Sequence, residues 1–159
     1  MILKDFTPRY YDVCSSPDNK YIPRVSNAGK IIDNYLIMHN GLKIHPLNYY
    51  GIPNLKMLIL NRGVHEPQQE RIFLKIPKHL PDNAVMIEMG SHWAFYSIWF
   101  NNSIKNAKYY IIEPDLIGLE FGKLNFKINN MKGTFYRAFI HSKSKIKKTK
   151  RLENSVVCT

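Results

Sequence analysis

The chain has 159 residues, a length typical of one domain, and its 45% hydrophobic residues are enough to build a core. No window reaches the roughly 18 uncharged apolar residues of a membrane-spanning helix, and the N-terminus lacks the basic head and apolar stretch of a secretory signal. The two cysteines, Cys14 and Cys158, form neither a zinc pattern nor a disulfide framework, so we expect a cytoplasmic protein without a metal.

The formal net charge of +11 raises the question of a nucleic-acid partner. The run KSKIKKTKR, Lys143 to Arg151, holds six basic residues and no acid, and it carries much of this excess. Such a run is most often a solvated segment and less often a phosphate contact. The sequence has no RNA-binding signature, zinc finger or basic zipper, so a non-catalytic nucleic-acid-binding module stays the alternative function.

Residues 1–63 are predicted to form an irregular segment that packs on the domain after it, because prolines interrupt the pattern repeatedly. Within this segment, the run IIDNYLIMH, Ile31 to His39, fits either a short helix or a short strand. The pairs Asn40–Gly41 and Arg62–Gly63 are typical of turns.

The next stretch, HEPQQERIFLKI from His65 to Ile76, favours a helix that ends near Pro77. Pro67 suits the first helical position, and the acids Glu66 and Glu70 suit the positive end of the helix dipole. His65 and Glu66 either begin this helix or form part of a lid over a ligand.

Strands and helices are then predicted in alternation, with strands at 84–89, 108–113 and 133–140 and helices at 93–102 and 115–129. The first strand is apolar on both faces, as a central parallel strand would be. The aromatic residues of the first helix are expected in the core. The second helix has one apolar face, formed by Ile117, Phe121, Leu124 and Ile128. This order predicts an α/β fold with a parallel, doubly wound sheet and flanking helices.

Two acids mark the ends of the first two strands. Glu88 lies at the end of the first strand, with Gly90 opening the turn after it, and Glu113 ends the second strand. Ligands of such sheets bind at the carboxyl ends of the strands, where a glycine lets the backbone approach closely. A carboxylate at the end of the second strand can accept both hydroxyls of a ribose. Asp115 is predicted to be the N-cap of the helix that follows.

The turn after the first strand does not match a dinucleotide fingerprint. The pattern GxGxxG needs a second glycine where this chain has His92, and a pyrophosphate would pack poorly against that residue. A cofactor that carries adenosine without a pyrophosphate fits better, and S-adenosylmethionine is the commonest one.

These residues resemble the front half of an FkbM-type methyltransferase, a family of Rossmann-like, S-adenosylmethionine-dependent enzymes. The first motif, an acid, glycine and a small residue, is matched by Glu88, Gly90 and Ala94. The second motif, a strand ending in Glu-Pro, is matched by Glu113 and Pro114. The segment HEPQ also looks like one branch of the family. The resemblance covers residues 64–140, which would be the cofactor-binding half of the domain, followed by a basic tail at 141–159.

The resemblance implies that Gly90 and Ser91 contact the methionine part of the cofactor and that Glu113 holds the ribose hydroxyls. Glu88 would orient the loop or bond the cofactor's amino group. The cofactor-binding set is completed by three flanking residues, His92, Pro114 and Asp115.

The family's usual acceptor is a hydroxyl on a small molecule or a sugar. The family fold has further strands after the third, so we expect a truncated domain, a homodimer or a missing C-terminal segment. No catalytic residue is assigned.

Overall fold

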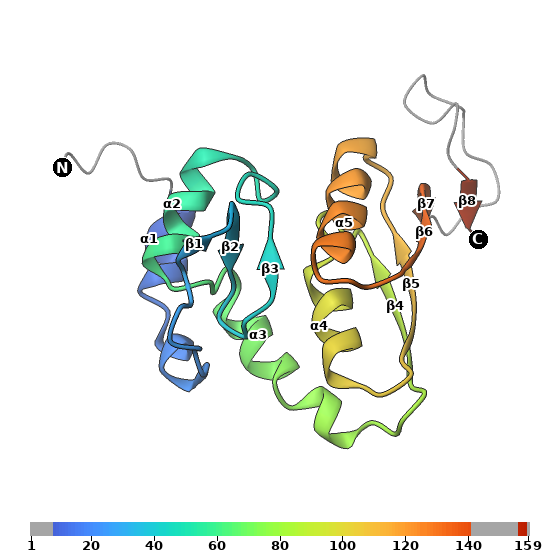
Figure 1. The fold of residues 1–159 in the computed structure, drawn as a ribbon, viewed down its shortest axis with the longest axis horizontal. Helices are drawn as coiled ribbons and strands as arrows, with labels where there is room; N and C mark the ends of the chain where they lie inside the picture. Colours follow the sequence, from blue (N-terminus) through green and yellow to red (C-terminus); the bar gives the residue numbers. More distant parts are fainter. Residues whose placement is uncertain (1–7, 141–155, 159) are drawn as a thin grey trace. The chain divides into compact units, whose positions relative to one another are not determined.

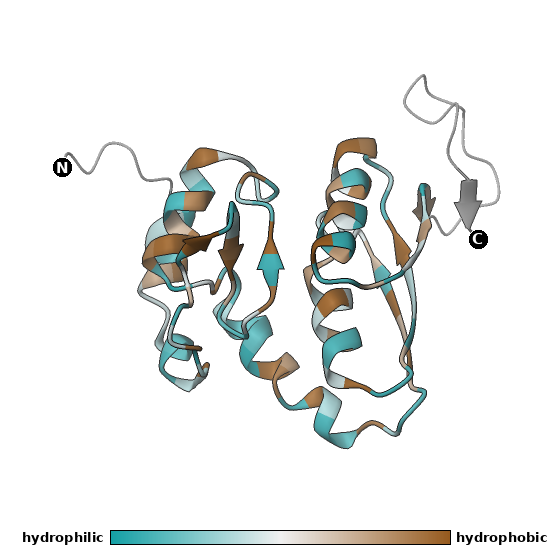
Figure 2. Cartoon of the chain, in the orientation of Figure 1, coloured by the Kyte–Doolittle hydropathy of each residue, from teal (hydrophilic) through white to brown (hydrophobic). Residues whose placement is uncertain are grey.

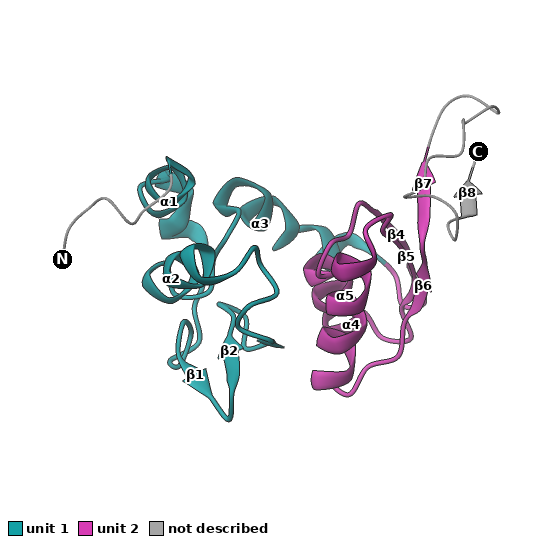
Figure 3. Ribbon diagram, turned by 90° about the horizontal axis from the view of Figure 1, so that it is seen from above, with its two compact units in different colours: residues 1–80 teal, residues 81–159 magenta. Residues whose placement is uncertain are grey.

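The computed structural model describes residues 8–140 and 156–158, and the chain forms two compact units, Met1–Leu80 and Pro81–Thr159 (Figure 3). The sequence placed the start of the cofactor-binding half at Val64, whereas the second compact unit begins at Pro81. None of the helices in the described ranges is long and apolar enough to cross a membrane. The basic run Lys143–Arg151 lies outside the described residues.

Unit 1 combines short helices with a small antiparallel sheet (Figure 1). Its helices are α1 (Pro8–Cys14), α2 (Ile52–Leu60) and α3 (Pro67–Phe73), with the 3-10 helices η2 (Pro17–Tyr21) and η3 (Ile76–His79). Its strands β1 (Ile31–Ile32), β2 (Tyr35–Ile37) and β3 (Lys43–Ile44) pair in that order. This ordered structure differs from the irregular segment expected for residues 1–63.

The run Ile31–His39 forms a hairpin, which decides between the two predicted alternatives. Asp33 and Asn34 adopt φ values of 50° and 67°, as a two-residue turn with a left-handed backbone requires, and both residue types tolerate that conformation. β1 and β2 flank this turn, and both strands are largely coloured hydrophobic in Figure 2. Leu36 is fully buried, so the hairpin supplies part of the core of unit 1.

The predicted turn at Arg62–Gly63 is confirmed, with φ values of 52° and 76°. A Cβ on Gly63 would lie 2.4 Å from the backbone nitrogen of His39, so only glycine fits here. The helix after this turn begins at Pro67, as predicted, but α3 already ends at Phe73, and η3 takes up the chain at Ile76.

Unit 2 is an α/β unit around a three-stranded parallel sheet. Its elements are β4 (Val85–Met89), α4 (Phe95–Ser103), β5 (Lys108–Ile112), α5 (Leu116–Ile128), β6 (Thr134–Tyr136), β7 (Ala138–Ile140) and β8 (Val156–Cys158). The sheet order is β4-β5-β6, and Glu88 pairs with Ile111 in the register between the first two strands. The predicted parallel sheet with flanking helices is therefore present.

Both helices of this sheet lie on one face, as in one half of the predicted doubly wound sheet. Its strands follow in chain order, so two crossovers of the same hand place α4 and α5 on the same face (Figure 3). The opposite face carries exposed apolar side chains, Val85, Ile87, Met89, Tyr110 and Tyr136.

The predicted strand 133–140 is divided in two at Arg137. β6 pairs with β5, whereas β7 leaves that sheet and pairs in parallel with β8, Ala138 opposite Val156. The Arg137 guanidinium donates to the carbonyl oxygen of Pro114 at 3.3 Å, which holds the chain where it turns away. β8 was not predicted from the sequence.

The buried face of α5 is not the predicted apolar one. Ile117 is 65% exposed and Leu124 is 37% exposed. The buried positions are instead Gly118, Leu119, Gly122, Asn125 and Phe126. Small residues lie where the backbone of a neighbouring loop comes close, and a search for recurring large apolar residues overlooks them. Of the aromatic residues of α4, Phe95, Trp99 and Phe100 are buried as predicted, whereas Tyr96 is only partly buried.

Candidate functional site

The turn between β4 and α4 lies at the carboxyl end of the parallel sheet, as the sequence predicts. The Gly90 N–H donates to the carbonyl of Ile112 at 2.9 Å, and the Ser91 N–H donates to the same oxygen at 3.2 Å. Glu113 follows Ile112 directly. The structure therefore brings Gly90, Ser91 and Glu113 together at one edge of the sheet.

The Glu113 carboxylate bridges the turns after β4 and β5. One oxygen accepts the backbone N–H of His92 at 2.6 Å, and the other accepts that of Asp115 at 2.8 Å. Glu113 is 6% exposed. An ionised carboxylate offers about four lone-pair sites, so these two bonds leave capacity for two more.

The Glu88 side chain points to the helical side of the sheet and caps α4. Its Oε2 accepts the backbone N–H of Ser97 at 3.0 Å and also contacts the Ser97 hydroxyl. The residue before the helix, Ala94, has no side chain that could cap it. A carboxylate at this place satisfies a helix N–H and complements the positive end of the helix dipole. An acid is thus present in an apolar run because it fixes the start of α4.

Gly90 leaves open space at the turn. Its φ is +70°, and a Cβ built on it would meet no heavy atom within 4 Å. Next to it, the Ser91 hydroxyl oxygen is buried and has no hydrogen-bond partner among the described residues. A turn with open space beside its backbone and a polar atom without a hydrogen-bond partner is suited to binding a ligand.

The rest of the turn is held by α5. His92 and Ala94 adopt φ values of 47° and 59°. A Cβ on Gly118 would lie 3.1 Å from the His92 ring, and one on Gly122 would lie 3.2 Å from the Ala94 Cβ. The buried Asn125 amide donates to the carbonyl of Trp93 at 3.1 Å. Sequence reasoning missed Gly118 and Gly122, although glycines four residues apart on one helix face are a readable sign of close packing.

Asp115 is the N-cap of α5, as predicted. Its side chain accepts the backbone N–H of Gly118 at 2.9 Å. Pro114 stands between Glu113 and this cap, and its carbonyl accepts the Arg137 side chain. Both residues therefore have a structural role at the same edge as Gly90.

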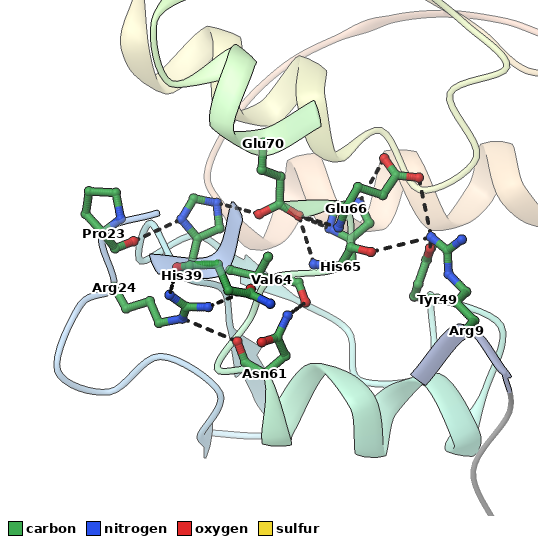
Figure 4. Close-up of polar contacts among 11 residues, drawn as sticks. Arg9, Pro23, Arg24, His39, Tyr49, Asn61, Val64, His65, Glu66 and Glu70 are labelled. Atoms are coloured by element: carbon green, nitrogen blue, oxygen red, sulfur yellow. Dashed lines mark hydrogen bonds and ion pairs between the residues drawn. The ribbon is translucent and has the colours of Figure 1, made fainter. Parts of the chain in front are cut away.

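Unit 1 contains a second polar cluster, which the sequence did not predict (Figure 4). Glu70 is fully buried between two buried histidines, with 3.0 Å from its Oε2 to His39 Nε2 and 2.7 Å from its Oε1 to His65 Nδ1. The same Oε1 accepts the backbone N–H groups of His65 and Glu66. The carboxylate thus joins the end of the hairpin to the start of α3.

Electrostatics keep Glu70 ionised. Burial by itself raises the pKa of this carboxyl, but the charge of His65 and the hydrogen bonds of both imidazoles outweigh it. The pKa therefore lies far below its ordinary value of 4.5. At the edge of the cluster, Arg9 contacts Glu66 at 3.4 Å and the Tyr49 hydroxyl. Burial raises the pKa of Tyr49 to about 12, although Arg9 opposes the shift.

In the described ranges, no group of three or more His, Cys, Asp or Glu side chains is arranged to hold a metal ion. The histidine–glutamate cluster is buried, and beside it Arg24 and Asn61 donate to the carbonyl oxygens of Ile22 and Val64.

No protein-family model and no curated protein matches this sequence. Among solved structures, the chain is similar to a precorrin-6Y C5,15-methyltransferase from Geobacter metallireducens GS-15. The TM-score is 0.39 and the identity 27%, over 45% of this chain and 39% of that chain. It is also similar to a geranyl diphosphate methyltransferase in complex with GPP and sinefungin. There the TM-score is 0.41 and the identity 15%, over 81% of this chain and 49% of that chain. The chain thus spans less than half the length of either structure, and at these TM-scores neither similarity assigns a function.

Proposed function

We propose that unit 2 is the cofactor-binding part of an S-adenosylmethionine-dependent methyltransferase. The observation that supports this proposal is the pair of acids, Glu88 and Glu113, at the carboxyl ends of neighbouring parallel strands. Gly90 opens the turn between them, where ligands of parallel α/β sheets bind. The FkbM-type motifs of the sequence fall on this turn and on the next one.

The residues at the turn fit such a cofactor. The space at Gly90 admits a ligand close to the backbone, and the unpartnered Ser91 hydroxyl would bond its polar methionine part. Glu113 would hold the ribose hydroxyls with its remaining lone pairs. His92, Pro114 and Asp115 would border the site, and Glu88 would act through α4 by fixing the helix start.

When bound, the cofactor would supply a sulfonium methyl group to an acceptor oxygen: the S–CH3 bond breaks, the sulfur leaves as a neutral thioether, and the hydroxyl proton passes to solvent. The acceptor proposed for this chain is a hydroxyl on a small molecule or a sugar. The chain's own part is to bind and orient the cofactor, because the strands and α5 fix the turn before the ligand arrives.

The proposal is tested by calorimetric titration of the full chain with S-adenosylmethionine, with a nicotinamide dinucleotide as the control ligand. We expect saturable binding of the first ligand alone. Glu113→Gln keeps the shape of the side chain, but it removes the charge and one pair of acceptor sites. We expect it to weaken binding by about tenfold or more, since a hydrogen bond to a charged group contributes about 1.5–3 kcal/mol.

Glu120→Gln is the matched control, because Glu120 is exposed on α5 and pairs only with Lys123 in the described structure, at 2.7 Å. This variant should bind like the parent chain. Equal binding by the Glu113 and Glu120 variants would remove the ribose role. Failure of the folded parent chain to bind S-adenosylmethionine would refute the proposed function.

A further inference from the structure

A groove in unit 1 combines an apolar floor with a cationic rim. It lies between η2 and the α3–η3 segment and has a volume of about 380 Å³. This is within the range of roughly 300–1,000 Å³ that is typical of small-molecule sites. The lining residues are Asp18, Gln68, Arg71, Ile72, Lys75, Ile76 and His79.

The floor is formed by two isoleucines that face solvent. Ile72 is 62% exposed and Ile76 is 40% exposed. They are four residues apart, so α3 and the start of η3 present them on one side. Adjacent exposed apolar side chains in a concave site favour an apolar ligand body.

One wall of the groove is fixed by an ion pair. The Arg71 guanidinium lies 2.5 Å from an Asp18 oxygen and stacks over the Tyr21 ring at 4.1 Å from its centroid. These contacts hold η2 against α3 and balance the charge of Arg71 with that of Asp18. Arg71 has further N–H donors in its planar group, which can still bond an anion.

Two further side chains with N–H donors, Lys75 and His79, line the groove. Lys75 and His79 are exposed, and within residues 8–140 no hydrogen bond or ion pair occupies their side chains. Both side chains line the same groove as Arg71 and the two isoleucines. A phosphate monoester has three terminal oxygens and a charge that such a set of donors would complement.

We propose that this groove binds a soluble amphiphile, an apolar chain that ends in a phosphate monoester. The phosphate contacts Lys75, His79 and Arg71, and the chain covers Ile72 and Ile76. This inference does not depend on the proposed function, because every lining residue belongs to unit 1 and the cofactor site belongs to unit 2.

The test is calorimetric titration of the full chain with hexyl phosphate. Inorganic phosphate alone tests binding of the phosphate group, and hexanol alone tests binding of the apolar chain. We expect hexyl phosphate to bind saturably, and each partial probe to bind at least about tenfold more weakly. Lys75→Glu and Ile72→Asn should each weaken the binding of hexyl phosphate by a similar factor. Lys78→Glu is the matched control, since Lys78 is exposed on η3 but does not line the groove.

Equal weakening by the Lys75 and Lys78 variants would overturn the inference, because it would mean non-specific attraction to a basic surface. Equal affinity for hexanol and hexyl phosphate would show that the basic side chains do not bind the phosphate. No binding of hexyl phosphate would show that the groove is not a binding site for such a ligand. Single-stranded RNA is the competitor arm. If it displaces hexyl phosphate and its own binding is lost in Lys75→Glu, the partner is a nucleic acid and not a small amphiphile. Circular dichroism checks that each variant is folded.

Discussion

Replacement of Glu70 by glutamine should strongly destabilise unit 1. The substitution keeps the size of the side chain but removes the negative charge that His39 and His65 contact at 3.0 Å and 2.7 Å. All three side chains are almost completely buried, so water cannot replace the lost interaction. The glutamine oxygen still accepts backbone N–H groups at the start of α3, and its amide group then faces one of the histidines as a second donor.

The magnitude follows from the burial. Removing one partner of a buried ion pair lowers the free energy of unfolding by about 3–5 kcal/mol. Because glutamine keeps part of the hydrogen bonding, we expect a loss of about 3 kcal/mol for Glu70→Gln. A unit of roughly 80 residues has a stability of about 4–12 kcal/mol. At about 4–8 °C per kcal/mol, the expected fall in Tm of unit 1 is about 12–24 °C.

The pH dependence has a definite sign. The folded pKa of Glu70 lies below its unfolded value of 4.5, so the stabilisation is fully present above pH 4.5 and is lost as the pH falls towards the folded pKa. The difference in unfolding free energy between the parent and Glu70→Gln should therefore narrow as the pH falls below 4.5.

Hydrogen exchange measured by mass spectrometry is the assay that separates the units. Peptides from β2, the turn at Gly63 and α3 should exchange faster in Glu70→Gln, while peptides from β4 and β5 keep their parent rates. Glu66→Gln is the matched control, because its pair with Arg9 is partly exposed and worth about 0–1 kcal/mol. A Glu70 variant as stable as the Glu66 variant would refute the reasoning from the buried ion pair.

Three further predictions address other parts of the chain. In ultraviolet titration, Tyr49 should ionise near pH 12. The stability that its raised pKa contributes should be present below pH 10 and lost as the pH rises towards 12. A Tyr49→Phe chain whose ultraviolet titration matches that of the parent would contradict this. Ile117→Lys should change thermal stability little, whereas Leu119→Lys, at a buried position, should prevent folding of unit 2; the reverse order would restore the face predicted from the sequence. Asp115→Ala should cost about 1 kcal/mol in chemical denaturation, and no loss would show that the cap contributes nothing.

The elements of unit 2 were largely readable from the sequence, because their signals are local. The strand that ends at Met89 is indicated by its apolar composition. The helix after Asp115 is indicated by its composition and by this capping residue. The break at Arg137 was not readable, since it depends on a contact with Pro114, which is remote in sequence. The predicted buried face of α5 was wrong for a similar reason, because the burial of Gly118 and Gly122 depends on contact with His92 and Ala94, which only the fold brings close.

The candidate site was predictable in place but not in detail. The positions of Gly90 and Glu113 follow from strand ends, which periodicity locates well. That Glu113 bonds the His92 N–H depends on the close approach of two turns, which no spacing in the chain encodes. The cluster in unit 1 was missed entirely, because His39 and Glu70 are far apart in sequence and only the fold brings them together.

Three buried or half-buried acids of this chain share one structural role. Glu70, Glu88 and Glu113 each accept backbone N–H groups at the start of a helix or in the turn before it. An acid in an apolar run is therefore evidence first for an organised helix start and only second for a ligand. Of the three, Glu113 alone bonds the turn that follows Gly90, through the His92 N–H. The two roles separate experimentally. A glutamine that lowers stability and leaves affinity unchanged identifies an organiser, and one that lowers affinity at unchanged stability identifies a ligand contact.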